Sequence, residues 1–269
     1  MILVIDCGNT HLVGAVATET SISDVFRIPT SELKTAEQSE EKLRRGLSEI
    51  SPAGSDANPG LPHHAMVASV VPGITPHLIA ALTAITGTKP LTLKDPQVEL
   101  NIDIDIERPD EVGDDRLVNV AGLSGEVPLP ALIIDFGTAT TIDLVHGSEA
   151  GRPVYSGGII APGVHRSVEA LVAAAAQLSP IEIEAFGPEL PVLGKNTEQA
   201  MKSGILWGYV SLIDGLIARL ASHIGQDCPA VATGGLAPLF APHIPSITYI
   251  DPNLTLRGLY HIFMHSQRR

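Results

Sequence analysis

ALIIDFGTAT, at residues 131–140, repeats the pattern of MILVIDCGNT at residues 1–10. In each segment an apolar run typical of a buried strand ends on an aspartate, and a glycine turn with amide or hydroxyl side chains follows. The two aspartates, Asp6 and Asp135, are separated by nearly half of the 269 residues. We therefore expect an internal duplication, with one copy of the pattern at the start of each half.

The segments that follow each copy have the same order, with three strands first and alternating helices and strands after them. In the first half the pattern predicts strands at 1–6, 11–18, 24–29, 65–71 and 90–94, helices at 35–50, 75–86 and 110–124, and a Pro/Gly/Ser loop at 51–62. In the second half it predicts strands at 131–136, 140–145, 153–161, 229–233 and 246–250, and helices at 163–177, 196–222, 236–241 and 253–265. This order predicts a duplicated α/β fold whose halves flank a cleft that both aspartate–glycine turns face.

The composition excludes several classes of protein. The formal net charge of −13 disfavours non-specific binding to nucleic acid, because an acidic surface repels phosphate backbones. Cys7 and Cys228 make neither a disulfide framework nor a zinc-finger spacing, which fits a reducing compartment. The N-terminus lacks the basic and long apolar regions of a signal peptide, and no apolar stretch approaches the roughly 20 residues of a membrane span. We expect a cytoplasmic protein without a membrane or nucleic-acid partner.

The first turn, at residues 6–10, has the parts of a phosphate-binding loop. Gly8 lets a backbone N–H group approach an anion, Asn9 and Thr10 offer donors, and Asp6 could orient a hydrated cation. An ordinary hairpin turn is the alternative for this segment alone. The second turn, at residues 135–141, adds a run of hydroxyl groups, for which the strand propensity of threonine is the alternative. Because the turns occupy matching places in the two halves, together they favour phosphate binding.

Four acidic residues and an arginine surround Gly113 within residues 109–116. Phosphoryl transfer to an alcohol needs a carboxylate near the hydroxyl group and a cation near the phosphoryl group, which Asp115 and Arg116 could supply. The alternative is an ordinary helix N-terminus, where the macrodipole favours acidic side chains.

The sequence Gly-Lys-Asn-Thr at 194–197 precedes the long helix that is predicted at 196–222. Either Asn196 or Thr197 can cap this helix, and its free N–H groups can hold an anion. The helix is apolar on two faces, which predicts either a central core helix or a helix with one face packed on a second subunit.

Taken together and in this order, the motifs resemble those of type III pantothenate kinases, which belong to the acetate and sugar kinase/Hsp70/actin superfamily. The resemblance covers nearly the whole chain and rests on DCGNT at 6–10, SVVPG at 69–73, PDEVGDDR at 109–116, DFGTATTID at 135–143, GGIIAPG at 157–163, GKNT at 194–197, TGGLA at 233–237 and DPNLTLRGL at 251–259. It implies a duplicated ribonuclease-H-like (actin-like ATPase) fold with domains at 1–128 and 129–269, assembled as a homodimer. It also implies transfer of the γ-phosphoryl group of ATP to pantothenate, the first step of coenzyme A synthesis.

The resemblance implies a role for each matching residue. It implies that ATP is bound by Thr138 and by Asp6, Cys7, Gly8, Asn9, Thr10, His11, Leu12 and Val13. It implies that pantothenate is bound by Gly113, Asp114, Asp115, Arg116 and Thr197, with Asp115 as the proton acceptor. It implies that Asp135 holds a monovalent cation, potassium or ammonium, and that magnesium accompanies ATP. The residues alone would have assigned Asp135 to magnesium.

Two positions depart from the family pattern. Asp114 stands where members usually carry alanine; a second carboxylate facing the cleft beside Asp115 would raise the pKa of one of them, and we expect Asp114 to point to solvent instead. Ile106 stands where many members carry a tyrosine that contacts the substrate, so a hydrogen bond to pantothenate is missing or is supplied elsewhere. These departures leave two alternatives: a non-catalytic nucleotide-binding accessory or regulatory protein on the same fold, and a kinase for another small alcohol.

Overall fold

The computed structural model describes residues 1–50, 62–123, 125, 127–175, 177–183, 186 and 190–267. Nearly all of the loop predicted at 51–62 lies outside these residues. The chain forms two compact units, the first made of Met1–Ser124, Ser148–Val154 and Asn253–Arg269 and the second of Gly125–Gly147 and Tyr155–Pro252. The division into ribonuclease-H-like domains at 1–128 and 129–269 stays a prediction.

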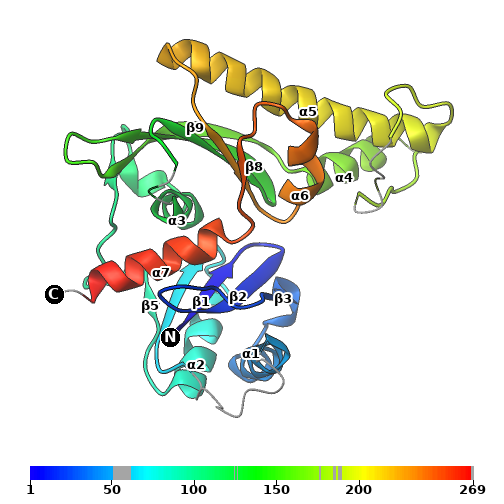
Figure 1. The fold of residues 1–269 in the computed structure, drawn as a ribbon. Coiled ribbons are helices and arrows are strands. Elements are labelled where there is room, and N and C mark those ends of the chain that lie inside the picture. The colour runs from blue at the N-terminus through cyan, green and yellow to red at the C-terminus, as the bar shows by residue number, and fades with distance from the viewer. Residues whose placement is uncertain are drawn as a thin grey trace. The chain divides into compact units, whose positions relative to one another are not determined.

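A five-stranded sheet forms the centre of the first unit (Figure 1). Its strands are β1 (Ile2–Cys7), β2 (His11–Ala17), β3 (Phe26–Pro29), β4 (Ala65–Ser69) and β5 (Leu91–Thr92), in the order β3-β2-β1-β4-β5. The central strand β1 pairs antiparallel with β2 and parallel with β4. Asp6 and Cys7 therefore lie at the carboxyl end of the middle strand, where neighbouring strands also end or turn.

Helices cover both faces of this first sheet. On one face α1 (Ala36–Ile50) and α2 (Thr75–Thr86) bury Leu43 and Leu82 against Ile5 and Cys7 of β1. From the other face α7 (Leu254–Ser266) contacts β1, β2 and β4, and it packs on α3 (Asp114–Gly122) (Figure 1). Since side chains alternate along a strand, Asp6 points to the face opposite the one that Ile5 and Cys7 share with α1 and α2.

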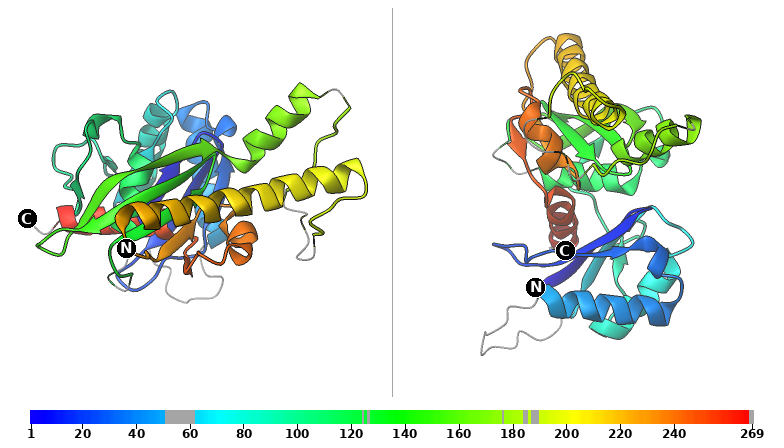
Figure 2. Two further views of the ribbon diagram at one scale, coloured as in Figure 1. Left: turned by 90° about the horizontal axis from the view of Figure 1, so that it is seen from above. Right: turned by 90° about the vertical axis from the view of Figure 1, so that its right-hand side faces the viewer.

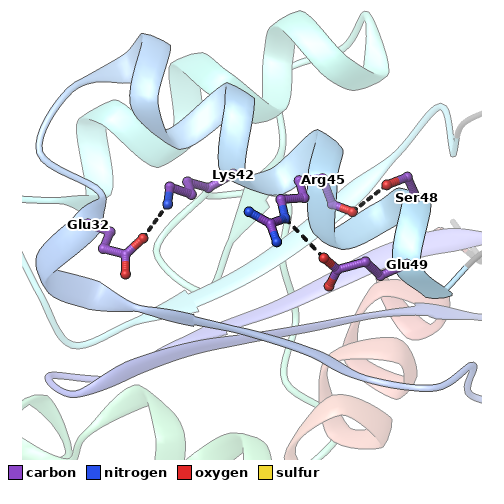
Figure 3. A network of polar contacts seen from close by, with 5 residues as sticks. All are labelled: Glu32, Lys42, Arg45, Ser48 and Glu49. Carbon is purple, nitrogen blue, oxygen red and sulfur yellow. Dashed lines mark hydrogen bonds and ion pairs between the residues drawn. The ribbon is translucent and has the colours of Figure 1, made fainter.

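The solvent side of α1 carries a local network of polar contacts (Figure 3). Lys42 pairs with Glu32 of the 3-10 helix η1 (Thr30–Glu32). Arg45 Nε donates to Glu49 Oε1 at 3.1 Å, one helical turn away, and Ser48 Oγ donates to the carbonyl oxygen of Arg45 at 2.6 Å. Exposed i,i+4 pairs contribute about 0.3–0.5 kcal/mol each, so this charged helix face is solvated surface that supports α1.

A six-stranded sheet contains the core strands of the second unit. Its members are β6 (Asp103–Ile104), β7 (Ala131–Phe136), β8 (Ala139–Gly147), β9 (Pro153–Pro162), β10 (Ala230–Thr233) and β11 (Tyr249–Ile250), in the order β11-β10-β7-β8-β9-β6. The strand β7 pairs antiparallel with β8 and parallel with β10, and β10 pairs parallel with β11. The sequence did not predict β6, which has only two residues.

The two sheets repeat one topology. Strands β7 to β11 take the places of β1 to β5 in the same spatial order. The directions also agree, because β1 has an antiparallel neighbour in β2 and a parallel neighbour in β4, as β7 has in β8 and β10. The structure thus confirms the predicted duplicated α/β fold and places Asp6 and Asp135 at equivalent positions of the two sheets.

Three helices cover one face of the second sheet. They are α4 (Val164–Ala174), α5 (Thr197–Ile224) and α6 (Ala237–Phe240), and a 3-10 helix η3 (Ala241–His243) follows α6. Leu132, Ile134 and Phe136 of β7 point to this side and join a buried core with Leu206 and Ile213 of α5. Asp135 alternates with them and therefore points to the opposite face.

Helix α5 corrects one expectation drawn from the sequence. By length and composition it is apolar enough to cross a membrane, although no such stretch was expected. Ile213 and Ile217 of this helix are buried in the core of the second unit, and a core helix of a soluble protein passes the same test. The end of α4 and the beginning of α5 project beyond the strands of the second sheet (Figures 1 and 2).

The last helix, α7, returns to the first unit and crosses α3 at close range. A Cβ atom on Gly258 would collide with the carbonyl oxygen of Val118, and a Cβ atom on Gly122 would collide with the backbone of α7. Thr255 Oγ1 donates a hydrogen bond to Asn119 Oδ1 at 2.7 Å across the same contact. The two glycines allow the backbones of α3 and α7 to touch, and this contact holds α3 in place.

Candidate functional site

The β1–β2 turn presents polar groups at the end of the first sheet. Gly8 N donates to the carbonyl oxygen of His11 at 3.0 Å, which closes the turn. Thr30 holds it from the side, because its N–H group donates to the carbonyl oxygen of Thr10 at 3.0 Å and its Oγ1 donates to that of Gly8 at 2.7 Å. Asn9, Thr10 and His11 are exposed. The turn is therefore fixed by its backbone while its side chains stay accessible to a ligand.

Two side chains of the predicted ATP-binding segment are not accessible. Cys7 and Leu12 are buried in the core of the first unit. Burial is the main reason that the pKa of the Cys7 thiol is raised to about 11. The hydrogen bond with Ser69 lowers this pKa, and the negative charge of Asp6 raises it further. The thiol stays protonated at neutral pH, and these two positions offer a ligand only their backbone groups. Val13, which pairs with Asp6 across the hairpin, is half-buried.

The N-terminus of α3 is formed by Gly113, Asp114, Asp115 and Arg116, and the helix begins later than the sequence predicted. Pro109–Glu111 form the separate 3-10 helix η2, and Gly113 has an extended conformation with φ −63° and ψ 137°, which interrupts the helix expected from residue 110. Asp115 Oδ1 accepts a hydrogen bond from its neighbour's backbone, Arg116 N, at 2.9 Å. A Cβ atom on Gly113 would collide with this carboxylate. Because Gly113 has no Cβ atom, the Asp115 carboxylate has room to lie at the N-terminal end of α3.

Asp114 is half-buried, which corrects the expectation that it points to solvent. Burial raises its pKa, the positive charge of Lys94 lowers it and the negative charge of Asp115 raises it. Because burial is the largest cause, the local environment favours the protonated form of Asp114 relative to an exposed aspartate. Lys94 had not been identified from the sequence, since it lies about 20 residues earlier in the chain.

Ile106 is half-buried in the segment between β6 and η2. Arg152 supports β6, directly before this segment, because its Nη2 lies 3.3 Å from Asp103 Oδ1 and 3.4 Å from the carbonyl oxygen of Ile102. Ile106 offers an apolar surface and no hydrogen bond at the position where the family pattern has tyrosine.

The β7–β8 turn of the second unit resembles the β1–β2 turn in its backbone. Gly137 N donates to the carbonyl oxygen of Ala139 at 3.1 Å, so this turn is also closed by the glycine that follows the strand, although it is one residue shorter than the turn that Gly8 N closes on His11. Thr138 is exposed at the tip. A Cβ atom on Gly163, at the end of β9, would collide with the carbonyl oxygen of Thr138. Thr138, the predicted ATP-binding threonine, therefore packs closely against Gly163, a contact that was not predicted from the sequence.

Asp135, the predicted cation ligand, is covered by a second glycine turn. Gly234 follows β10 with φ +89°, a conformation that favours glycine. A Cβ atom at this position would collide with Asp135 Oδ1, and one on Gly137 would approach the same oxygen to 3.3 Å. The two glycines leave space around the carboxylate. Within the described residues no three His, Cys, Asp or Glu side chains come together as a metal cluster, so an ion here would also need other oxygen ligands.

Thr197 is the first residue of α5, and Asn196 is its N-cap, which settles the two candidates for the cap. Asn196 Oδ1 accepts from Gln199 N at 2.8 Å, and Gln199 Oε1 accepts from Lys195 N at 3.0 Å. Thr197 is exposed at the edge of a pocket of about 460 Å³ whose other walls are apolar, including Leu171 and Met201. Its hydroxyl group is therefore free of the capping role and available to a ligand.

The described units divide the predicted residues into two sets. The first unit contains the segment 6–13 and the N-terminus of α3, and the second unit contains Asp135, Thr138 and Thr197. The sequence missed the charge of Lys94 near Asp114 and the supporting contacts of Thr30 and Gly163, because each depends on how separate segments of the chain come together.

Comparisons with known proteins identify the family to which the chain is similar. The family model described as type III pantothenate kinase matches residues 2–219. The chain is 42% identical to the type III pantothenate kinase of Rhodospirillum rubrum over 269 residues, which cover 99% of both chains. It is 41% identical to that of Rhizorhabdus wittichii over 260 residues, which cover 96% of both.

Two solved structures show the same fold at low sequence identity. A glucokinase from an Antarctic psychrotroph has a TM-score of 0.51 and 11% identity, with 98% of both chains covered. The ROK hexokinase from Thermus thermophilus has a TM-score of 0.50 and 12% identity, with 100% of this chain and 99% of that chain covered. These likenesses confirm the expected actin-like ATPase fold class.

Proposed function

This chain belongs to the type III pantothenate kinase family, and we propose a role for each of its site residues in the phosphorylation of pantothenate. The enzyme transfers the γ-phosphoryl group of ATP to pantothenate in coenzyme A biosynthesis. In this reaction a bond forms between the pantothenate hydroxyl oxygen and the γ-phosphorus, the bond between that phosphorus and ADP breaks, and the hydroxyl proton leaves to a base.

Asp115 is the base in this proposal. Its carboxylate is oriented by the Arg116 N–H group at 2.9 Å and lies against Gly113, where a Cβ atom would collide with it. The neighbouring Asp114 is half-buried with a raised pKa, which makes its ionised form less available than that of an exposed aspartate. Arg116 supplies a positive charge for pantothenate or for the phosphoryl group. The orientation of the Asp115 carboxylate is the single observation that supports this assignment most.

The two glycine turns bind the phosphates of ATP. Gly8 and Gly137 occupy the equivalent hairpin positions after β1 and β7, and each turn is closed by its own backbone hydrogen bond. Exposed Asn9, Thr10 and Thr138 add side-chain donors. Backbone N–H groups and hydroxyl groups aimed at phosphate oxygens stabilise the charge that phosphoryl transfer spreads over them.

The residues present fit the two cations that the family pattern implies. Asp135 has a carboxylate with space left by Gly137 and Gly234, which suits a monovalent cation that binds oxygen ligands. Asp6, at the equivalent place in the first sheet, is the proposed ligand of the water shell of the magnesium ion that accompanies ATP. When bound, these cations neutralise the phosphate charge.

Pantothenate binding in this proposal uses Gly113 to Arg116 and Thr197, with Ile106 as an apolar contact in place of the family's tyrosine. Thr197 is exposed beside an apolar pocket and is not needed as the helix cap. The pocket walls suit the methyl groups of a small organic acid, and the hydroxyl group of Thr197 suits its polar end.

A homodimer is also proposed, with the projecting part of α4 and α5 as its interface. Leu171, Val192 and Leu193 are exposed apolar residues near this projection, and Gly204 and Gly208 present open space on α5. Apolar side chains in such a group are costly to leave in water, and glycines let a second helix approach closely. Light scattering is expected to give the mass of two chains; the mass of one chain in the working concentration range would contradict the assembly.

We also propose a cytoplasmic location, as the sequence predicts. Both cysteines, Cys7 and Cys228, are free thiols, which a reducing compartment preserves.

A single assay tests the proposed function. The purified chain is expected to consume ATP with pantothenate, magnesium and potassium present, and to stop when pantothenate is omitted or when choline replaces potassium. The measurement is ADP release, with formation of the phosphorylated product followed by mass spectrometry. Folded protein that binds ATP but forms no product with pantothenate would reject the pantothenate kinase, and it would leave an accessory role or a kinase for another alcohol. Turnover of another small alcohol in a substrate panel, without turnover of pantothenate, would reject pantothenate as the substrate and keep the kinase activity.

A further inference from the structure

Asp135 has a threonine on each side in the second sheet. It pairs with Thr141 on β8 and with Thr233 on β10. Paired residues of neighbouring strands point to the same face of a sheet, and such strands lie about 4.8 Å apart. The carboxylate and two hydroxyl groups therefore project from one face, opposite the face on which Phe136 enters the core.

The first sheet provides an internal comparison because it repeats the same topology. Asp6, the equivalent of Asp135, pairs with Val13 on β2 and with Ala68 on β4. Neither neighbour has a hydroxyl group. The fold can thus be built with apolar residues at both positions, and packing alone does not require a threonine at 233.

The hydroxyl group of Thr233 is also unusual in having no partner within the described part of the chain. Thr233 is 1% exposed, and its Oγ1 is buried without a hydrogen bond. Buried polar atoms are almost always satisfied, because an unmade hydrogen bond is costly. Thr141 differs, since its Oγ1 donates to Asp143 Oδ2 at 3.3 Å. Rotation of the Thr233 side chain toward Asp135 would break no hydrogen bond.

We propose that the Thr233 hydroxyl oxygen is a second side-chain ligand, beside the Asp135 carboxylate, for the monovalent cation. This inference rests on the cation site of the proposed function and adds a residue to it. Potassium binds neutral and charged oxygen ligands together, so a hydroxyl group next to a carboxylate suits it. Gly234, directly after Thr233, leaves room for the ion by presenting no Cβ atom to Asp135.

Thermal unfolding of the complete chain tests the proposal without an activity measurement. The parent chain is compared with Thr233→Val in KCl and in choline chloride at equal ionic strength. Without potassium the variant is expected to unfold at the parent's temperature or above it, because valine removes an unpartnered hydroxyl group and keeps the shape. The KCl concentration for half-maximal stabilisation is expected to rise about tenfold or more, since even outer partners of metal ligands have effects of that size.

Three further variants separate the possible causes. Thr140→Val removes another buried, unpartnered hydroxyl group, but Thr140 pairs with Phe136 and lies on the opposite face, so its potassium response should match the parent's. Thr233→Ser keeps the hydroxyl group and should keep the response. Asp135→Asn should lose it. If Thr233→Val does not fold, Thr233→Ala replaces it in the comparison, because alanine occupies the equivalent position 68 of the first sheet.

The outcomes decide between the inference and the proposed function. A potassium response lost in Thr233→Val and Asp135→Asn, but kept in the other two variants, supports the ligand. A response kept in Thr233→Val and lost in Asp135→Asn overturns the role of Thr233 and leaves the Asp135 site standing. No response in the parent chain overturns both. Stabilisation by ADP that is lost in Thr233→Val, with the potassium response intact, assigns the hydroxyl group to the nucleotide and also overturns the inference.

Discussion

Replacing Asp115 by asparagine is expected to lower kcat for pantothenate phosphorylation by about two to four orders of magnitude, the usual contribution of a positioned general base. Asparagine keeps the size of the side chain and can still accept the hydrogen bond from Arg116 N, but it cannot take a proton from the pantothenate hydroxyl group. ATP binding should be unchanged, because the proposed phosphate turns lie at residues 6–13 and 137–138. Product formation measures the loss, and calorimetric titration with ADP measures nucleotide binding.

Asp110→Asn provides the matched control for this variant. Asp110 is an exposed residue of η2, only a few residues from Asp115, and it undergoes the same change of charge. Its kcat should stay close to that of the parent chain, which separates the loss of a base from a general change of local charge. Parent-like kcat in Asp115→Asn would reject Asp115 as the proton acceptor. Equal losses of kcat in both variants would instead show that the summed negative charge of residues 109–116 affects the rate, and not a proton acceptor at Asp115.

The sequence predicted the fold where the pattern is local. The runs at 1–6 and 131–136 are apolar, short and bounded by glycine turns, so they indicated buried strands before any pairing was known. Their repetition predicted the duplication that the two sheets confirm. The turn residues Gly8 and Gly137 could be identified in the same way, because the chemistry of a tight turn depends on its own few residues.

The supporting contacts could not be predicted because they depend on strand pairing and helix crossing. Thr233 stands about a hundred residues from Asp135 and becomes its neighbour only when β10 pairs with β7. Gly163 and Thr138 meet in the same indirect way. The late start of α3 was missed for a different reason, since the acidic residues at 110 and 111 suit a 3-10 turn as well as a helix N-terminus.

Gly258→Ala is expected to destabilise the first unit by about 3 kcal/mol, at the upper end of what overpacking usually costs. The added Cβ atom would enter the position of the Val118 carbonyl oxygen on α3. Backbone cannot rotate away as a flexible side chain can, so α7 and α3 must separate. That separation would weaken the hydrogen bonds from Thr255 to Asn119 and between His261 Nδ1 and the Ala121 carbonyl oxygen. Urea denaturation of the complete chain measures the loss of unfolding free energy.

Gly73→Ala makes the same chemical change at an open position of the same unit. Nothing lies within 4 Å of a Cβ atom there, and Gly73 does not have a positive φ. Its unfolding free energy should stay within about 0.5 kcal/mol of the parent's or increase, because alanine restricts the unfolded chain. Helix propensity alone favours alanine over glycine by about 1 kcal/mol within α7. A stabilised Gly258→Ala variant would therefore show that propensity outweighs the contact, and that α3, with Asp115 at its start, does not depend on close contact with α7.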